Sequence, residues 1–160
     1  MKIILRAGGI MRSGPERDMV DDYITRAQGL ARATGFISVS EDSIDLRAAK
    51  TRPDETLRLL DGIPNQAHII VLDERGKTPT SRQIAKKFEG WRDDGVSATY
   101  LLIGGADGFD PDTLKNAAPS NITRWALGPQ TWPHKLVRVM AAEQIYRALS
   151  IMARTPYHRD

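Results

Sequence analysis

Short runs of aliphatic and β-branched residues alternate along the chain with longer segments in which apolar residues recur every three or four positions. Five such runs predict strands, at residues 2–6, 36–40, 68–73, 98–104 and 122–127. Several are apolar at nearly every position, which is typical of strands covered on both faces. The pattern therefore predicts an α/β domain, with a mostly parallel sheet and helices on both faces.

The segments between the runs predict helices, and several carry boundary signals. Residues 15–33 place apolar side chains on one helical face, namely Met19, Tyr23, Ala27 and Leu30. Residues 80–94 do the same, and Thr80 with Gln83 three positions later forms a capping-box pattern. Shorter helices are expected at residues 51–60 and 110–117, the second opened by an Asp-Pro pair typical of a helix start.

The last helical segment, residues 136–152, differs because apolar residues surround most of it. A helix that is apolar around most of its girth needs cover on more than one side. Either a second subunit or the interior of the domain could supply this cover. The small size of the chain favours a subunit partner.

Composition limits the possible chemistry. The 160 residues suit one domain spanning 1–160, with 41% hydrophobic and 27% charged residues. Cysteine is absent, so disulfides, thiolate metal sites and a cysteine nucleophile are excluded. The short apolar start and the lack of a long apolar run favour a soluble cytoplasmic protein with no membrane partner.

The net charge of +3 is concentrated at the end of the chain. Residues 135–160 contain five basic residues (Lys135, Arg138, Arg147, Arg154, Arg159) and two acidic ones (Glu143, Asp160). The remaining 18 basic and 18 acidic residues cancel, since 23 − 5 and 20 − 2 are equal. This distribution is compatible with a phosphate-binding face or with the solvated end of a helix.

Three glycine-bearing loops follow predicted strands, at residues 74–77, 105–108 and 128–133. Glycine allows a ligand to approach the main chain, and ligands bind beyond the carboxyl ends of strands in open α/β sheets. Motifs for dinucleotides, P-loop phosphates and zinc proteases are absent from the sequence. The loops therefore predict a pocket lined by backbone groups, without a metal.

Two stretches, "LLIGGADGF" at residues 101–109 and "WPHKLVRVMAAEQIYRALSIMARTPYHR" at 132–159, closely resemble the RlmH family of SPOUT-class methyltransferases. The "VLDERGK" stretch at 71–77 and the chain length fit as well, whereas residues 12–65 match more loosely. Members of this family methylate N3 of a pseudouridine in 23S ribosomal RNA. The resemblance implies a SPOUT fold with a C-terminal trefoil knot, S-adenosylmethionine as cofactor, and a homodimer that acts on 23S rRNA in the assembled 70S ribosome.

The resemblance also assigns the site. Cofactor contacts carry over to Leu72, Gly104, Gly105, Gly128, Pro129, Gln130, Thr131, Trp132 and Pro133. The expected catalytic group is His158, Tyr157, Arg147 and Arg159. In our interpretation His158 assists proton removal or orients the base, Tyr157 stacks on or hydrogen-bonds it, and the two arginines neutralise phosphates or the developing anion.

Some of these residues and their neighbours could instead have purely structural roles. Arg147 could form an intersubunit salt bridge, Tyr146 and Glu143 are assigned to the dimer interface, and His134 to the start of the last helix or to the cofactor loop. Trp91 and Trp125 read as core, and Trp132 as core or cofactor loop. Two other functions are kept as alternatives: a SPOUT methyltransferase acting on tRNA, and a non-enzymatic ribosome-binding factor.

Overall fold

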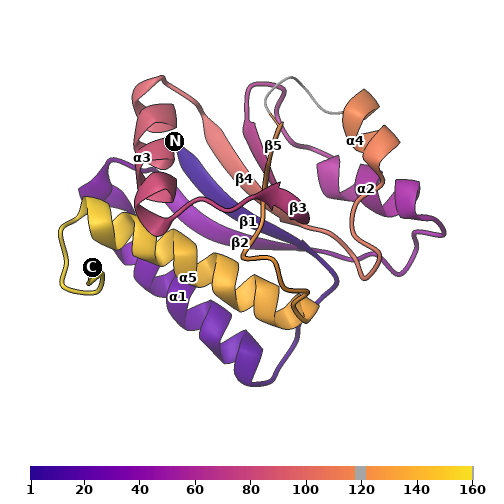
Figure 1. Ribbon diagram of the computed structural model, residues 1–160, viewed down its shortest axis with the longest axis horizontal. Coiled ribbons are helices and arrows are strands. Elements are labelled where there is room, and N and C mark those ends of the chain that lie inside the picture. Colours follow the sequence, from indigo (N-terminus) through magenta and orange to yellow (C-terminus); the bar gives the residue numbers. More distant parts are fainter. Residues whose placement is uncertain (118–121, 160) are drawn as a thin grey trace.

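The computed structural model describes residues 1–117 and 122–159 and contains one five-stranded parallel sheet (Figure 1). The strand order is β2-β1-β4-β3-β5. The strands are β1 (Lys2–Gly8), β2 (Ser38–Ile44), β3 (His68–Lys77), β4 (Ala98–Ile103) and β5 (Ile122–Trp125). The helices are α1 (Pro15–Ala31), the 3-10 turn η1 (Arg32–Thr34), α2 (Arg52–Leu60), α3 (Ser81–Asp93), α4 (Pro111–Ala117) and α5 (His134–Met152). The predicted α/β class with a parallel sheet is confirmed.

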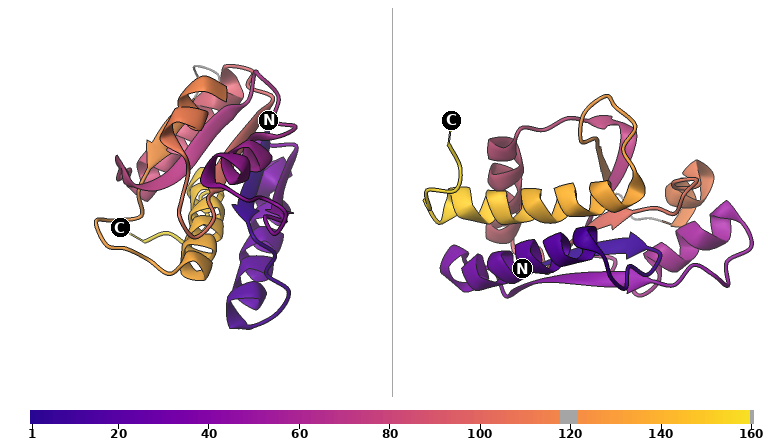
Figure 2. Two further views of the ribbon diagram at one scale, coloured as in Figure 1. Left: turned by 90° about the vertical axis from the view of Figure 1, so that its right-hand side faces the viewer. Right: turned by 90° about the horizontal axis from the view of Figure 1, so that it is seen from below.

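Both faces of the sheet are covered, as Figure 2 shows from two further directions. Alternate residues of one strand point to opposite faces. Ile70 accordingly joins the larger core with α1, α3 and α5, whereas Ile69 and Val71 pack against α2 and α4. The nearly continuous apolar runs of the sequence follow from this two-sided burial.

Several predicted boundaries are corrected. The second strand starts at Ser38 and runs to Ile44, because it pairs residue by residue with β1 over that range. The third continues through residues 74–77, which we expected to form a loop. Lys77 pairs with Trp125, and its carbonyl accepts the Ala126 N–H at 2.8 Å. Leu72 pairs with Trp125 as well, so the register shifts between Leu72 and Lys77, and the turn-like residues lie in this irregular part of β3.

The predicted helix starts are largely confirmed. Thr80 and Gln83 form the reciprocal capping box at α3, and Thr51 caps α2 by accepting the Asp54 N–H. The face predicted for α1 is partly wrong, since Met19 is 45% exposed. Its neighbour Val20 is the buried residue, because the side of α1 that meets α5 is turned by one position.

Helix α5 begins at His134, two residues earlier than predicted, and its own chain covers most of it. It packs against α1 and α3, and Figure 1 shows it lying along α1. Leu136 near its start remains 39% exposed. Internal packing thus explains most of the apolar girth, and the homodimer stays a prediction.

One basic residue of the C-terminal segment lies in the interior. Arg138 is 1% exposed, and its Nε lies 2.8 Å from Oε1 of Glu41 as an ion pair. Its Nη2 donates to Ser43 at 3.0 Å and to the Gly9 carbonyl at 3.2 Å. Burial outweighs the attraction of Glu41 and lowers the pKa of Arg138. This residue cannot belong to a phosphate-binding face, so the charge count overstated that face.

The close approach of β3 to β5 requires a glycine at position 76. A Cβ added at Gly76 would lie 2.5 Å from the Trp125 carbonyl carbon, which is backbone and cannot give way. We expect Gly76→Ala to lower the free energy of unfolding by about 1–3 kcal/mol. Thermal unfolding measures this, with Gly29→Ala as the control, since a Cβ at that helical position meets open space. Equal melting temperatures for the two variants would contradict this prediction.

Candidate functional site

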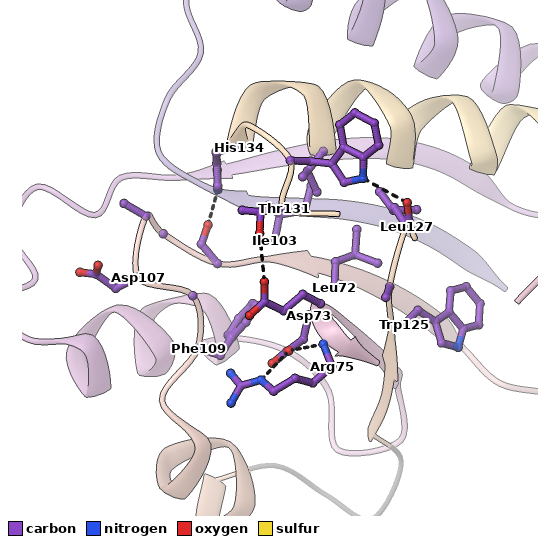
Figure 3. Close-up of a pocket in the computed structure, with 18 of the residues that line it drawn as sticks. Leu72, Asp73, Arg75, Ile103, Asp107, Phe109, Trp125, Leu127, Thr131 and His134 are labelled. Carbon is purple, nitrogen blue, oxygen red and sulfur yellow. Dashed lines mark hydrogen bonds and ion pairs between the residues drawn. The ribbon is translucent and has the colours of Figure 1, made fainter. Parts of the chain in front are cut away.

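A cavity of about 450 Å³ lies where the carboxyl ends of β3, β4 and β5 meet. The end of β3, the loop after β4 and the loop between β5 and α5 form its walls (Figure 3). Parallel strands bring their carboxyl ends to one edge, which is where open α/β sheets bind ligands. The start of α5 closes the cavity through His134 and Val137.

Seven of the nine predicted cofactor residues line this cavity. They are Leu72, Gly104, Gly105, Gly128, Gln130, Thr131 and Trp132. Pro129 and Pro133 lie in the same loop but are not among the lining residues. Pro133 instead forms the N-cap position of α5. The fold thus brings together segments that are separated by more than fifty residues in the sequence.

The loop after β5 is held by a few polar contacts. The indole Nε1 of Trp132 donates to the Leu127 carbonyl at 3.2 Å, and the Thr131 hydroxyl donates to Glu74 at 3.5 Å. Gly128 has φ of 109°, a conformation that an L side chain rarely adopts. Trp132 therefore belongs to the cavity loop, and it remains 40% exposed.

His134 connects the two sides of the cavity. It is the first residue of α5, and its Nε2 forms a short hydrogen bond with the Gly104 carbonyl at the end of β4. Figure 3 shows this hydrogen bond, which joins the start of α5 to the end of β4 beside the cavity. His134 therefore begins the helix and also lines the cavity, and its part in binding the cofactor stays a prediction.

The cavity combines apolar walls with acidic groups. Leu72, Ile103 and Leu127 supply apolar surface, and Asp73, Glu74 and Asp107 supply carboxylates. Burial pushes the pKa of Asp73 upward, but hydrogen bonds from the backbone and side chain of Arg75 outweigh burial and lower it. Asp73 is thus ionised at neutral pH. Arg52 and Arg75 also line the cavity, and Arg75 forms an ion pair with Asp73. The lining therefore suits a ligand that combines a flat apolar part with charged groups of both signs.

Arg52 is a lining residue that sequence reasoning missed. It comes from α2, and its Nη2 donates to the Phe109 carbonyl at 2.6 Å. Little in the sequence indicates this position, because Arg52 lies in the loosely matching segment 12–65. Its hydrogen-bond partner Phe109 is 57 positions away. Trp125, predicted as core, is 3% exposed and also lines the cavity.

The tail after α5 folds back onto its own helix. The Tyr157 hydroxyl donates to Oε1 of Glu143 at 3.0 Å, and Arg147 forms a 2.5 Å ion pair with the same oxygen. The Arg147 guanidinium lies over the Tyr157 ring at 4.7 Å, and Nη1 of Arg147 is 3.4 Å from Nδ1 of His158. Three of the four predicted catalytic residues are therefore adjacent, whereas Arg159 is exposed beyond them.

Glu143 holds this cluster together, a role that the sequence did not suggest. The Glu143–Arg147 spacing of four positions on a helix was the available signal. Arg147 has an ion-pair partner within its own chain, and an intersubunit salt bridge stays an untested alternative. Tyr146 also contacts the tail, with its ring 4.5 Å from that of Tyr157.

Tyr157 is kept protonated by its surroundings. Burial raises its pKa most, followed by hydrogen bonds with Tyr23 and Glu143. A phenol whose pKa is raised above its ordinary value of about 10 donates hydrogen bonds at neutral pH and is a poor proton acceptor. Tyr157 is therefore not suited to be the proton acceptor.

The tail and the cavity of one chain are separated. No tail residue within the described range 1–117 and 122–159 lines the cavity. Glu143, where Tyr157 docks, follows His134 by nine positions, or about 14 Å along the helix axis. The cavity and the predicted catalytic cluster therefore do not form one site within a single chain.

Comparison with known proteins identifies the family. A family model described as "Predicted SPOUT methyltransferase" matches residues 1–158. The chain belongs to the SPOUT methyltransferases. The resemblance noted in the sequence is thereby confirmed at the level of the family.

Curated relatives support the same placement over the full length of this SPOUT methyltransferase. Proteins named "Ribosomal RNA large subunit methyltransferase H" are 47% identical in Maricaulis maris, covering 100% of both chains, and 47% identical in Hyphomonas neptunium, covering 99% of both. The protein of that name in Roseobacter denitrificans is 44% identical, again over 100% of both chains.

Two further observations concern metals and membranes. In residues 1–117 and 122–159, no group of three or more His, Asp or Glu side chains is arranged to hold a metal ion. Over the same residues, none of the helices combines the length and apolarity that crossing a bilayer requires.

Proposed function

We propose that this SPOUT methyltransferase transfers a methyl group from S-adenosylmethionine to N3 of a pseudouridine in 23S ribosomal RNA, on the assembled 70S ribosome in the cytoplasm. The observation that carries the proposal is the cavity, which gathers seven of the nine residues that the family resemblance assigns to the cofactor. The names of the full-length relatives support large-subunit rRNA as the substrate.

The cavity suits the proposed cofactor. S-adenosylmethionine carries an adenine ring and two positive centres, the sulfonium and the amino group. Leu72, Ile103 and Leu127 offer apolar surface for the ring, while Asp73 and Glu74 offer negative charge. The sulfonium supplies an activated methyl group for in-line transfer. The protein has to align the donor and acceptor and exclude water.

The acceptor requires help from the tail. N3 of pseudouridine is an imide N–H between two carbonyls, which attacks only after it loses its proton. In the proposal His158 takes or directs this proton, and Tyr157 orients the base by stacking on it or by accepting a hydrogen bond from it. Arg147 and Arg159 stabilise the negative charge that develops on the base or bind neighbouring phosphates.

A homodimer would bring the two halves of the site together. Since the tail of one chain docks away from its own cavity, the proposal assigns it to the cavity of the partner. The exposed apolar side chains Trp132 and Leu136, beside the cavity and at the start of α5, are candidates for this interface. The trefoil knot implied by the resemblance belongs to the same proposal.

The experiment is methyl transfer from labelled S-adenosylmethionine to 70S ribosomes, with free subunits and naked RNA in parallel. We expect the label to appear in one pseudouridine of 23S rRNA, and only with 70S particles. Mapping the modified base by mass spectrometry decides the position and the atom. Label in free 50S subunits, or in another base, would contradict the 70S substrate or the N3 assignment.

The same assay separates the alternatives. An enzyme acting on tRNA would methylate deproteinised tRNA and leave 70S particles unlabelled. A non-enzymatic ribosome-binding factor would show no S-adenosylmethionine binding by calorimetry, and it would keep its function with His158→Ala and Tyr157→Phe.

A further inference from the structure

A second hollow of about 370 Å³ opens on the same edge of the sheet as the cavity. We call it the β1–β2 groove; its lining residues are Gly9, Ile10, Arg12, Asp45, Leu46 and Arg47. The segments that form it follow β1 and β2, which Figure 1 shows side by side. Because all strands are parallel, the groove and the cavity lie on one continuous edge of the sheet.

Leu46 separates the groove from the cavity. Its Cδ1 lies 2.6 Å from the position of a Cβ at Gly8 and 3.3 Å from that of a Cβ at Gly105. Gly105 lines the cavity, whereas Leu46 lines the groove. The Glu55 carboxylate lies closer still to Gly105. A chain molecule with one unit at the mouth of the cavity can therefore continue into the groove past Leu46 and Glu55.

The groove carries two exposed arginines, one from each segment. Arg12 forms no ion pair with a residue of the described ranges, and the Arg47 side chain is 78% exposed. Asp45 fixes Arg47, since it accepts the Arg47 backbone N–H, Nε and Nη2. Nη1 of Arg47 is left to face a ligand, and the guanidinium is already oriented. A pre-organised arginine such as Arg47 suits phosphate oxygens.

The surroundings of the groove add further positive charge. Residues 9–14 and 44–58 contain five basic and three acidic residues, a balance of +2. The basic residues of the second range include Arg52, which lines the cavity, and Arg58. Hydrogen bonds from Arg47, with a smaller contribution from the charge of Arg58, lower the pKa of Asp45 to about 2. The net charge of residues 1–134 does not reveal this positive excess, because α1 contains four acidic residues and two basic ones.

We propose that the β1–β2 groove binds the phosphate backbone of the RNA next to the nucleotide that is presented to the methyl donor at the mouth of the cavity. Arg12 and Arg47 contact phosphates, and Ile10, which is 49% exposed, packs against a neighbouring base or sugar. The proposal rests on the proposed function and gives the loosely matching segment 12–65 a role. The RNA is then held on the side of the cavity formed by the N-terminal half of the chain.

The test is the affinity of the full-length protein for 70S ribosomes, measured by co-sedimentation over a range of salt concentrations. For the double variant Arg12→Ala, Arg47→Ala we expect affinity to fall about tenfold or more. The slope of log affinity against log salt should decrease by about one for each arginine that no longer meets a phosphate. Binding of S-adenosylmethionine should be unchanged, which also shows that the variant is folded.

The matched control is Lys2→Ala, Arg32→Ala, which removes two exposed charges at the opposite edge of the sheet. Unchanged ribosome affinity of the groove variant, or an equal loss in the control, would overturn the proposal. So would a loss without a change in salt slope, which indicates binding to a ribosomal protein. The affinity for ribosomes alone decides whether the groove binds RNA. The proposed function is tested separately, and it fails if the wild-type protein methylates no ribosomal RNA.

Discussion

Deleting Tyr157 to Asp160 is expected to abolish methyl transfer while leaving the fold and cofactor binding intact. The deletion removes Tyr157, His158 and Arg159 together, so the acceptor base loses its proton acceptor and its orienting groups. The loss of positioned acid–base groups predicts a fall in rate of about 100-fold or more. Transfer of labelled methyl to 70S ribosomes measures this.

The fold should survive because neither main hydrophobic core contains a tail residue. The ion pair between Glu143 and Arg147 also remains after the deletion. Circular dichroism and calorimetry with S-adenosylmethionine should therefore match wild type. A chain that lacks only Asp160 is the control and should keep full activity. A truncated protein that still methylates at the wild-type rate would show that the tail has no part in the chemistry.

The fold was predictable because its three central strands, β1, β3 and β4, are largely buried on both faces. Continuous apolar runs such as residues 69–72 are typical of such strands in a small α/β protein. The end of β3 was not predictable, because residues 74–77 have the composition of a turn, and β3 resumes its pairing with β5 only at Lys77, after an irregularity in the register. Local composition contains no information about a partner that is nearly fifty positions away.

The candidate site also has features that the sequence predicts and features that it does not. Glycine-rich loops after parallel strands predicted the cavity, since the edge at which they meet follows from the topology. The contact between His134 and Gly104, and the cavity position of Arg52, depend on side-chain placement across the fold. The charge count also failed to separate the buried Arg138 from the exposed Arg47. Sequence reports the charge of a residue, while burial decides whether that charge meets a ligand.

The separation of tail and cavity leads to the second prediction, which concerns mixed dimers. One subunit carries Leu72→Arg, which places a positive charge in the cavity and repels a sulfonium. The other lacks residues 157–160. Each homodimer should be inactive, the first for lack of cofactor and the second for lack of a tail.

If the tail serves the partner's cavity, the mixed dimer has one complete site: the intact cavity of the truncated chain with the tail of the Leu72→Arg chain. Two different affinity tags allow this species to be purified, and its rate should be about half that of wild type because one of two equivalent sites works. If each tail served its own cavity, both subunits of the mixed dimer would be defective and the rate would stay near zero. Because α5 of one chain keeps its cavity and its tail cluster apart, recovery of activity is the expected result.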